Sequence, residues 1–112
     1  MIEILTAEEV RVLGCLMEKA VTTPDSYPLT VNALTAACNQ TTNRFPVVRY
    51  GEQEVTAALT TLRERSLTRI VYSPSNRAPK HRHVIDEAWH LTPDEVAVLC
   101  VLWFIPTIGL FV

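Results

Sequence analysis

GEQEVTAALTTLRERSLTRIVYSPSNRAPKHRHVI, residues 51–85, is the stretch that decides the fold of this 112-residue chain. Its first part has apolar residues at the spacing of one inward helical face, namely Val55, Ala58, Leu59 and Leu62. From Leu67 to Tyr72 the residues become β-branched and aromatic, and after the turn-forming Ser-Pro-Ser-Asn a second extended run lies around Arg82 to Ile85. The stretch therefore predicts a helix that begins near Gly51 and is followed by a β-hairpin.

Two further helices are expected before this stretch. Thr6 and Glu9 have the spacing of a capping box, and apolar residues then recur at helical spacing to about Ala20. Prolines at positions 24 and 28 exclude a continuous helix, and Thr30 can cap a second, short helix over residues 31–38. Helix, short helix, helix and hairpin is the order of a winged helix-turn-helix domain. We expect this domain over residues 1–88, as a mainly α fold with a small β-hairpin in the α+β class.

The end of the chain repeats its beginning. Residues 91–102, LTPDEVAVLCVL, align without a gap on residues 5–16, LTAEEVRVLGCL. A repeated helix opening indicates a second module of the same kind. We therefore expect residues 89–112 to form an orphan helix and apolar tail, the first helix of an incomplete second winged-helix module.

Residues 96–112 carry no charged side chain. The length of this segment is near the lower limit for crossing a bilayer. Because Pro106 and Gly109 interrupt the segment and no cation flanks it, we expect no membrane span. An exposed apolar strip needs a partner instead. We expect a homo-oligomer in which the apolar segment 93–112 of one copy meets the same segment of another.

The charges are segregated along the chain. Ten Lys and Arg against twelve Asp and Glu give a net charge of -2, which excludes a uniformly basic, histone-like protein. The net charge is -3 over residues 1–43, +5 over residues 44–85 and -4 over residues 86–112. Three cysteines without a CxxC pair do not fit a secreted disulfide scaffold, and the first residues lack the pattern of a signal peptide. We therefore expect a cytoplasmic protein.

A block in the first half of the chain has a distinctive sequence. It reads EKAVTTPDSYPL over residues 18–29 and continues with Asn32, ACNQ at 37–40, TNR at 42–44 and PV at 46–47. With this block the chain closely resembles the YceH family of uncharacterised bacterial proteins, over about residues 5–100. The resemblance implies two winged-helix modules in tandem, a coiled-coil-like tail in full-length members and no established activity. After Cys100 the sequence departs from the family's pattern.

The positive charge of the middle segment suggests a nucleic-acid site. Winged helices commonly place the third helix in the major groove and the hairpin on the neighbouring backbone. The residues that we expect to face the groove of double-stranded DNA are the outward-facing Thr56, Thr60 and Arg63. The residues that we expect to hold phosphates are the hairpin cations Arg77, Lys80 and Arg82, with His81 and His83 in the same cluster.

Two other interpretations stay open. Glu52 and Glu54, at the start of the third helix, would repel phosphates, which favours a protein docking module with no direct DNA contact. The hairpin cations also fit a solvated edge that keeps foreign strands from pairing. We expect a DNA-binding or regulatory module, with a docking module of the winged-helix type as the alternative.

Nothing in the sequence points to catalysis. The chain has no Gly-rich phosphate loop, and its cysteines, at positions 15, 38 and 100, lie in apolar stretches where a cysteine is usually a small buried side chain. His81 and His83 would share a strand face, but the cations beside them oppose a metal ion. We expect no enzyme activity, cofactor or metal, and a structural role for the amide-rich loop from Asn39 to Arg44.

Overall fold

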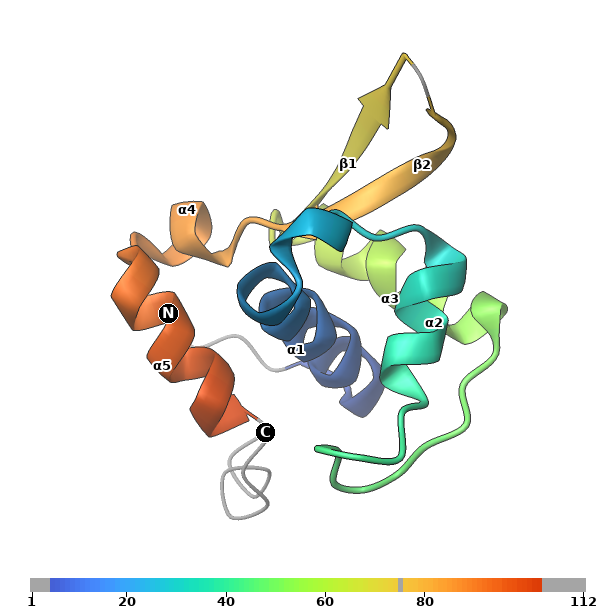
Figure 1. Cartoon of the computed structure of the whole chain (residues 1–112), viewed down its shortest axis with the longest axis horizontal. Coiled ribbons are helices and arrows are strands. Elements are labelled where there is room, and N and C mark those ends of the chain that lie inside the picture. Colours follow the sequence, from blue (N-terminus) through green and yellow to red (C-terminus); the bar gives the residue numbers. More distant parts are fainter. Residues whose placement is uncertain (1–4, 75, 104–112) are drawn as a thin grey trace.

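The computed structural model describes residues 5–74 and 76–103. The expectations for the tail after Trp103, including the breaks at Pro106 and Gly109, lie outside this described part. The elements follow one another in this order: α1 (Ala7–Thr22), the 3-10 helix η1 (Pro24–Ser26), α2 (Val31–Cys38), α3 (Glu52–Glu64), β1 (Thr68–Ser73), β2 (Asn76–His83), α4 (Ile85–Trp89) and α5 (Pro93–Trp103). The fold is mainly helical with one small antiparallel sheet, β1 and β2, and it is of winged-helix type (Figure 1).

Helix α1 is the centre of the helical body, with α2, α3 and α5 packed around it (Figure 1). It begins at the predicted capping box: the Thr6 amide donates to the Glu9 carboxylate at 2.8 Å, and the Glu9 amide donates to the Thr6 hydroxyl at 3.1 Å. The largest side chains that are fully buried come from α1, α2, α3 and the residues on either side of the hairpin, and include Leu13, Leu16, Met17, Leu34, Leu59, Leu62, Leu67 and Ile85. Burial of each such side chain stabilises the fold by about 1.5–3 kcal/mol.

Helix α3 turns its predicted face inward. Its buried residues are Val55, Ala58, Leu59 and Leu62. Gly51 precedes the helix, and its amide donates to the Glu54 carboxylate at 2.9 Å, which satisfies one of the amides that the helix leaves free. The 3.6-residue spacing therefore predicted the packing of this helix correctly.

The hairpin differs from the prediction in its second strand. The sequence predicts an extended run around residues 82–85, but β2 begins at Asn76 and ends at His83, because Val84 and Ile85 turn into the short helix α4. Thr68 pairs with His83 and Arg69 pairs with Arg82, so Arg82 lies near the base of the hairpin and not at its tip. The hairpin projects from one end of the helical body, and the loop between α2 and α3 lies at the opposite end (Figure 1).

The connector after α1 ties the base of the hairpin to the body. The Leu29 amide donates to the His81 carbonyl at 3.0 Å, and the His81 amide donates to the Leu29 carbonyl at 2.6 Å. This bridge is a minimal third strand beside β2. The Tyr27 hydroxyl also accepts a hydrogen bond from the His83 amide at 2.8 Å. The half-buried Tyr27 side chain therefore has a polar partner for its hydroxyl.

Helix α5 opens as α1 does. The Thr92 amide donates to the Glu95 carboxylate at 2.8 Å, and the Glu95 amide donates to the Thr92 hydroxyl at 3.2 Å, which reproduces the capping box of α1. Val96 and Cys100 of α5 are buried and belong to the same hydrophobic core as α1. In the described part of the chain, no helix combines the length and the apolar character that a bilayer crossing needs.

Candidate nucleic-acid interface

The two faces of the hairpin have different chemistry. Side chains of directly paired residues lie on the same face, and successive pairs alternate between faces. The pairs Thr68 with His83 and Ile70 with His81 therefore share one face, and Thr68, His81 and His83 are buried. The other face, which we call the outer wing face, carries Arg69, Val71, Lys80 and Arg82.

The outer wing face brings like charges together. Arg69 lies directly opposite Arg82, and Lys80 is two residues further along β2 on the same face. Like charges at directly opposed positions destabilise an antiparallel pair. Arg69 has a partner in Glu87 of α4, at 2.9 Å, but both side chains are more than half exposed, so this ion pair contributes little. The Arg82 Nε donates to the His83 carbonyl at 3.2 Å.

The histidines do not belong to the cationic cluster in which the sequence prediction placed them. Both side chains face the helical body, because positions 81 and 83 alternate with the outward-facing Lys80 and Arg82. Burial, together with the nearby Arg63, lowers the pKa of His81. Burial also lowers the pKa of His83, and the Ile85 amide donates to its Nδ1 at 3.3 Å. Both imidazoles are therefore neutral at pH 7 and add no charge to the hairpin.

The three predicted residues of α3 lie on one outward side of the helix. Thr56 and Arg63 are exposed and Thr60 is half-buried, with its hydroxyl donating to the Thr56 carbonyl at 3.0 Å. Arg63 lies at the end of α3 nearest the hairpin and lines, with Arg69 and Glu87, a hollow of about 360 Å³. The structure thus brings Arg63 next to the base of the hairpin.

The predicted hairpin cations are only partly brought together. Lys80 and Arg82 share the outer wing face, whereas the side chain of Arg77 is outside the described part of the chain. The sequence prediction missed Arg69, which completes this face. Its signal was the alternation of β1, in which position 69 falls between Thr68 and Ile70 and must point away from them.

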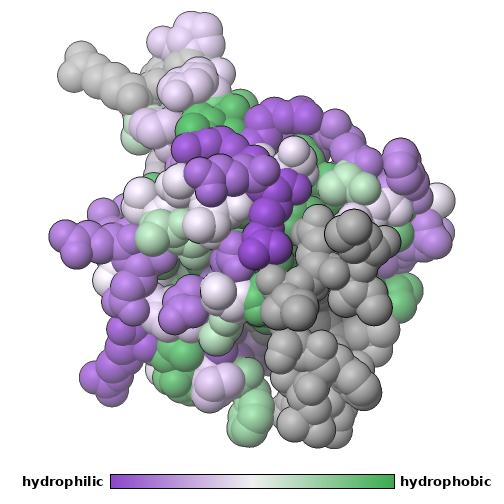
Figure 2. Space-filling view, turned by 180° about the vertical axis from the view of Figure 1, so that it is seen from behind, coloured by the Kyte–Doolittle hydropathy of each residue, from purple (hydrophilic) through white to green (hydrophobic). Residues whose placement is uncertain are grey.

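The start of α3 is acidic, as expected. Glu52 and Glu54 are both exposed there, and Glu52 lines a shallow hollow of about 470 Å³ with Gln53 and Thr56. Seen from behind, hydrophilic residues cover much of the surface and apolar residues appear in separate small areas (Figure 2). The carboxylates are in the first turn of α3, whereas Arg63, which shares a hollow with Arg69 of the hairpin, is in the last turn of the same helix.

The loop between α2 and α3 is held from inside by two buried arginines. The Arg44 Nε donates to the Ala37 carbonyl at 3.0 Å, and the Arg11 Nη1 donates to the Cys38 carbonyl at 2.8 Å. Arg11 also donates to the carbonyl of Pro46. Positive charge at the last carbonyls of a helix stabilises its C-terminus, so these contacts hold α2 as well as the loop.

An asparagine closes the same loop. The Asn39 side chain donates to the Tyr50 carbonyl at 2.8 Å and accepts from the Tyr50 amide at 2.7 Å. The Gln40 side chain donates to the Thr42 carbonyl at 2.8 Å. Asn39, Gln40 and Arg44 thus have structural partners, as the sequence prediction for the amide-rich loop favoured. The loop nevertheless displays two apolar side chains, Phe45 at 66% and Val47 at 51% exposure.

Comparison with known proteins identifies the family. Residues 5–105 match the family described as "Protein of unknown function, DUF480". The chain belongs to this family. A UPF0502 protein of Geotalea uraniireducens is 52% identical over 94 residues, which cover 84% of this chain and 42% of the relative. Those of Opitutus terrae and Solibacter usitatus are 50% identical over 99 and 98 residues, covering 88% of this chain and 43% and 47% of the relatives.

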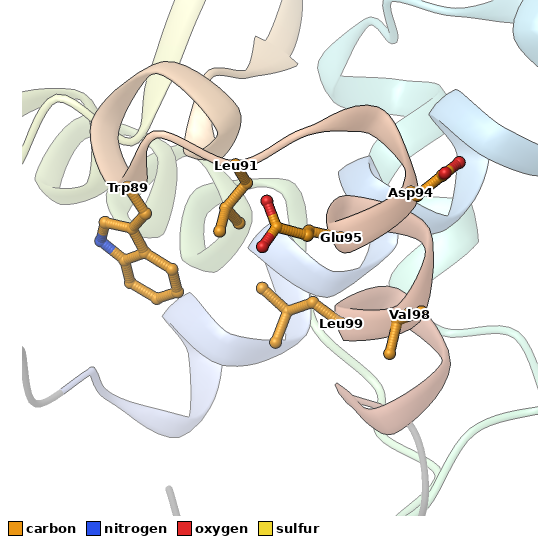
Figure 3. Close-up of a pocket in the computed structure, with 6 residues that line it drawn as sticks. All are labelled: Trp89, Leu91, Asp94, Glu95, Val98 and Leu99. Atoms are coloured by element: carbon orange, nitrogen blue, oxygen red, sulfur yellow. The ribbon is translucent and has the colours of Figure 1, made fainter.

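This DUF480 chain spans less than half the length of these curated relatives. Its last described helix, α5, has an apolar hollow of about 470 Å³ beside it. Trp89 and Leu91 lie on one side of the hollow, and Val98 and Leu99 of α5 lie on the other (Figure 3). Among the described residues, no group of three His, Cys, Asp or Glu side chains is arranged to hold a metal ion.

Proposed function

We propose that this chain is a non-enzymatic, cytoplasmic winged-helix module that binds double-stranded DNA, with its outer wing face on the phosphate backbone. One observation carries the proposal: exposed Arg69 lies directly opposite half-buried Arg82 on the outer wing face, while Thr68, His81 and His83 on the other face are buried. This opposition of like charges costs stability in the free protein. Phosphates bound between the two guanidinium groups would remove that cost.

Each predicted residue has a role in this proposal. Arg69, Lys80 and Arg82 contact phosphates, and from the sequence we assign Arg77 the same role. Arg63, beside the hairpin base, and the outward side of α3 with Thr56 and Thr60 face the groove. Phosphate contacts fix the position of the module and carry no sequence information, so only the α3 side chains would read bases.

A binding titration tests the proposal. The probe is a labelled duplex of random sequence, and its anisotropy is measured with increasing protein from about 50 to 200 mM salt. We expect the triple variant Arg69→Ala, Lys80→Ala, Arg82→Ala to bind all sequences more weakly. Its plot of log K against log salt should be shallower by about 0.9 for each phosphate that the variant no longer neutralises.

The matched control is Arg49→Ala. Arg49 is an exposed cation on the loop between α2 and α3 and not on the hairpin, so its replacement should leave the affinity and the salt slope nearly unchanged. No association of the unchanged protein at low salt, or equal weakening by the control and the triple variant, would refute the proposal.

A protein docking module without DNA contact is the second candidate. The exposed Phe45 and Val47 favour a docking function, because hydrogen bonds from Arg11, Arg44 and Asn39 hold their loop. Apolar side chains on a rigid loop lose little entropy on binding. The exposed Glu52 and Glu54, which follow this loop at the start of α3, favour a partner with a basic rim. Lack of duplex binding, together with a purified partner whose affinity falls in Glu52→Lys, Glu54→Lys, would support this function over the first.

The tandem arrangement expected from the resemblance to YceH proteins is also part of the proposal. Val98 and Val101 of α5 are 59% and 66% exposed, yet they align with Val12 and Cys15 of α1, which are fully buried. We propose that α5 is the first helix of a second winged-helix module, whose other helices would cover this face. The alternative occupant is the same apolar segment, 93–112, of a second copy of the chain.

A further inference from the structure

The hollow at the base of the hairpin gathers polar side chains from α3, β1 and α4. Its volume is about 360 Å³, and we call it the base hollow. Two arginines and one glutamate give its lining a net charge of +1. The polar residues that line it are Arg63, Ser66, Thr68, Arg69 and Glu87. The base hollow is thus a cationic site that side chains from several elements share.

One of these residues is buried and yet has a hydroxyl without a partner. Thr68 is only 5% exposed and lines the base hollow. Among residues 5–74 and 76–103, no group forms a hydrogen bond with the Thr68 hydroxyl. Buried polar side chains in folded proteins nearly always have such a partner. A ligand in the base hollow would supply the partner that the chain itself does not.

The Arg63 guanidinium has no counter-ion either. Its side chain is exposed, and none of the ion pairs among the described residues includes it. Arg63 is in the last turn of α3, where free backbone carbonyls would repel an anion. Here the amides of residues 65–67 donate to the carbonyls of residues 61–63 at 2.9 to 3.2 Å. These carbonyls are therefore occupied, and the Arg63 charge is available to a ligand.

The second guanidinium already holds an anionic oxygen. The Arg69 Nη2 lies 2.9 Å from a carboxylate oxygen of Glu87. Their side chains are 53% and 55% exposed, so water competes with this contact and makes it weak. Glu87 therefore marks a position where Arg69 binds an oxygen anion, and from which a more highly charged anion can displace the carboxylate.

We propose that the base hollow binds a phosphate group, held by Arg63 and Arg69, with the Thr68 hydroxyl donating to it and Glu87 displaced. Arginine forks bind phosphate oxygens through charge-assisted hydrogen bonds. The two guanidinium groups belong to different elements, and the tetrahedral oxygens of a phosphate can meet both. A planar carboxylate such as that of Glu87 meets only Arg69.

The phosphate group has two possible sources, a free phosphorylated small molecule and the backbone of a duplex. The inference does not rest on DNA binding, because the proposed function places the DNA backbone on the outer wing face and the base hollow needs no duplex. When the phosphate belongs to a duplex, Arg63 holds the backbone at the edge of the groove. Only Thr56 and Thr60 of the three α3 residues then read bases.

Titration of the folded protein with inorganic phosphate tests the site. Proton–nitrogen correlation spectra are recorded at about pH 7, with chloride at the same ionic strength as the reference. We expect the amide signals of Ser66, Thr68 and Arg69 and the Nε signal of Arg63 to shift and to saturate with phosphate. Equal shifts with the two salts would overturn the proposal.

Variants of the lining residues identify the donors. Arg63→Gln and Thr68→Val should each weaken phosphate binding about fivefold, since each removes one hydrogen-bond donor. Glu87→Gln should strengthen it, because the carboxylate no longer competes with the ligand. The matched controls Arg49→Gln and Glu52→Gln change exposed charges that do not line the base hollow and should leave phosphate binding unchanged. The same spectra show that each variant is folded, and equal effects of variants and controls would refute the site.

A duplex of random sequence then decides the source of the phosphate group. Shifts of the same amide signals with the duplex identify its backbone as the ligand. Shifts with inorganic phosphate alone identify a free phosphorylated molecule, and they support the site even if the duplex does not bind and the proposed function fails. Duplex binding without shifts in the base hollow, together with no saturable phosphate binding, would overturn this inference and leave the proposed function intact.

Discussion

The Arg44 guanidinium lies 2.6 Å from a carboxylate oxygen of Glu18 and joins α1 to the loop between α2 and α3. The Arg44 side chain is fully buried and that of Glu18 is 14% exposed. Because Arg44 also donates to the Ala37 carbonyl, one side chain holds an ion pair and the end of a helix at once. Glu18 and Arg44 both belong to the distinctive block of residues 18–47, and this contact joins them although 26 positions separate them in the sequence.

Replacement of Arg44 should destabilise the fold strongly. Arg44→Ala leaves Glu18 without its cation and the Ala37 carbonyl without its donor, and breaking a buried pair in this way costs about 3–5 kcal/mol. The free energy of unfolding in urea measures the effect. Arg69→Ala is the matched control, because it breaks an exposed arginine–carboxylate pair and should cost less than about 1 kcal/mol. Equal costs would show that the Arg44 contact does not hold the loop.

Acidification should destabilise the protein through its buried histidines. The pKa values of His81 and His83 are lowered in the fold, so below about pH 6.5 the unfolded chain binds protons that the folded chain does not. Stability is thus full above that pH and falls as the pH drops toward the folded-state values. Thermal unfolding between pH 7.5 and 5.5 measures the slope.

Two variants test whether the buried histidines cause this pH dependence of stability. His81→Gln cannot be protonated and should make the slope smaller. His90→Asn removes an exposed histidine, and Asn tolerates the left-handed φ of 55° at that position, so the slope should not change. A slope that is the same in the unchanged protein and in His81→Gln would contradict the prediction.

Tyr27 should stabilise the base of the hairpin by about 1 kcal/mol. Tyr27→Phe removes the hydroxyl that accepts from the His83 amide, while it keeps the ring, and burial raises the pKa of this hydroxyl to about 12. We expect faster hydrogen exchange at the His83 amide and a lower unfolding free energy. Tyr72→Phe, at a side chain that is 75% exposed, should change neither.

The exposed face of α5 should control self-association if a second copy covers it. The double variant Val98→Glu, Val101→Glu places charges on this face. Neither of the replaced side chains is buried, so the melting temperature should stay nearly the same. Sedimentation velocity should then show a dimer for the unchanged chain and a monomer for the variant. A monomeric unchanged chain would leave the other helices of a second module as the occupant.

Local features of the fold were predictable because they depend on residues a few positions apart. The capping boxes at Thr6 and Thr92, the inward residues of α3 and the order of α1, α2, α3 and the hairpin follow from spacing and side-chain chemistry alone, whereas η1 and α4 were not predicted. The predicted start of β2 was wrong, because strand pairing with β1 and the turn into α4 decide it. The burial of His81 and His83 was missed for the same reason.

The amino-acid sequence by itself determined the winged-helix order, the segregation of charge and the repeated helix opening, since these are properties of neighbouring residues. Only the tertiary structure decided which distant side chains meet. The strand register set Arg69 opposite Arg82, and the packing of the α2–α3 loop against α1 set Arg44 against Glu18. A one-residue shift of the register would turn every hairpin side chain to the other face, so local spacing alone could not decide which cations point outward.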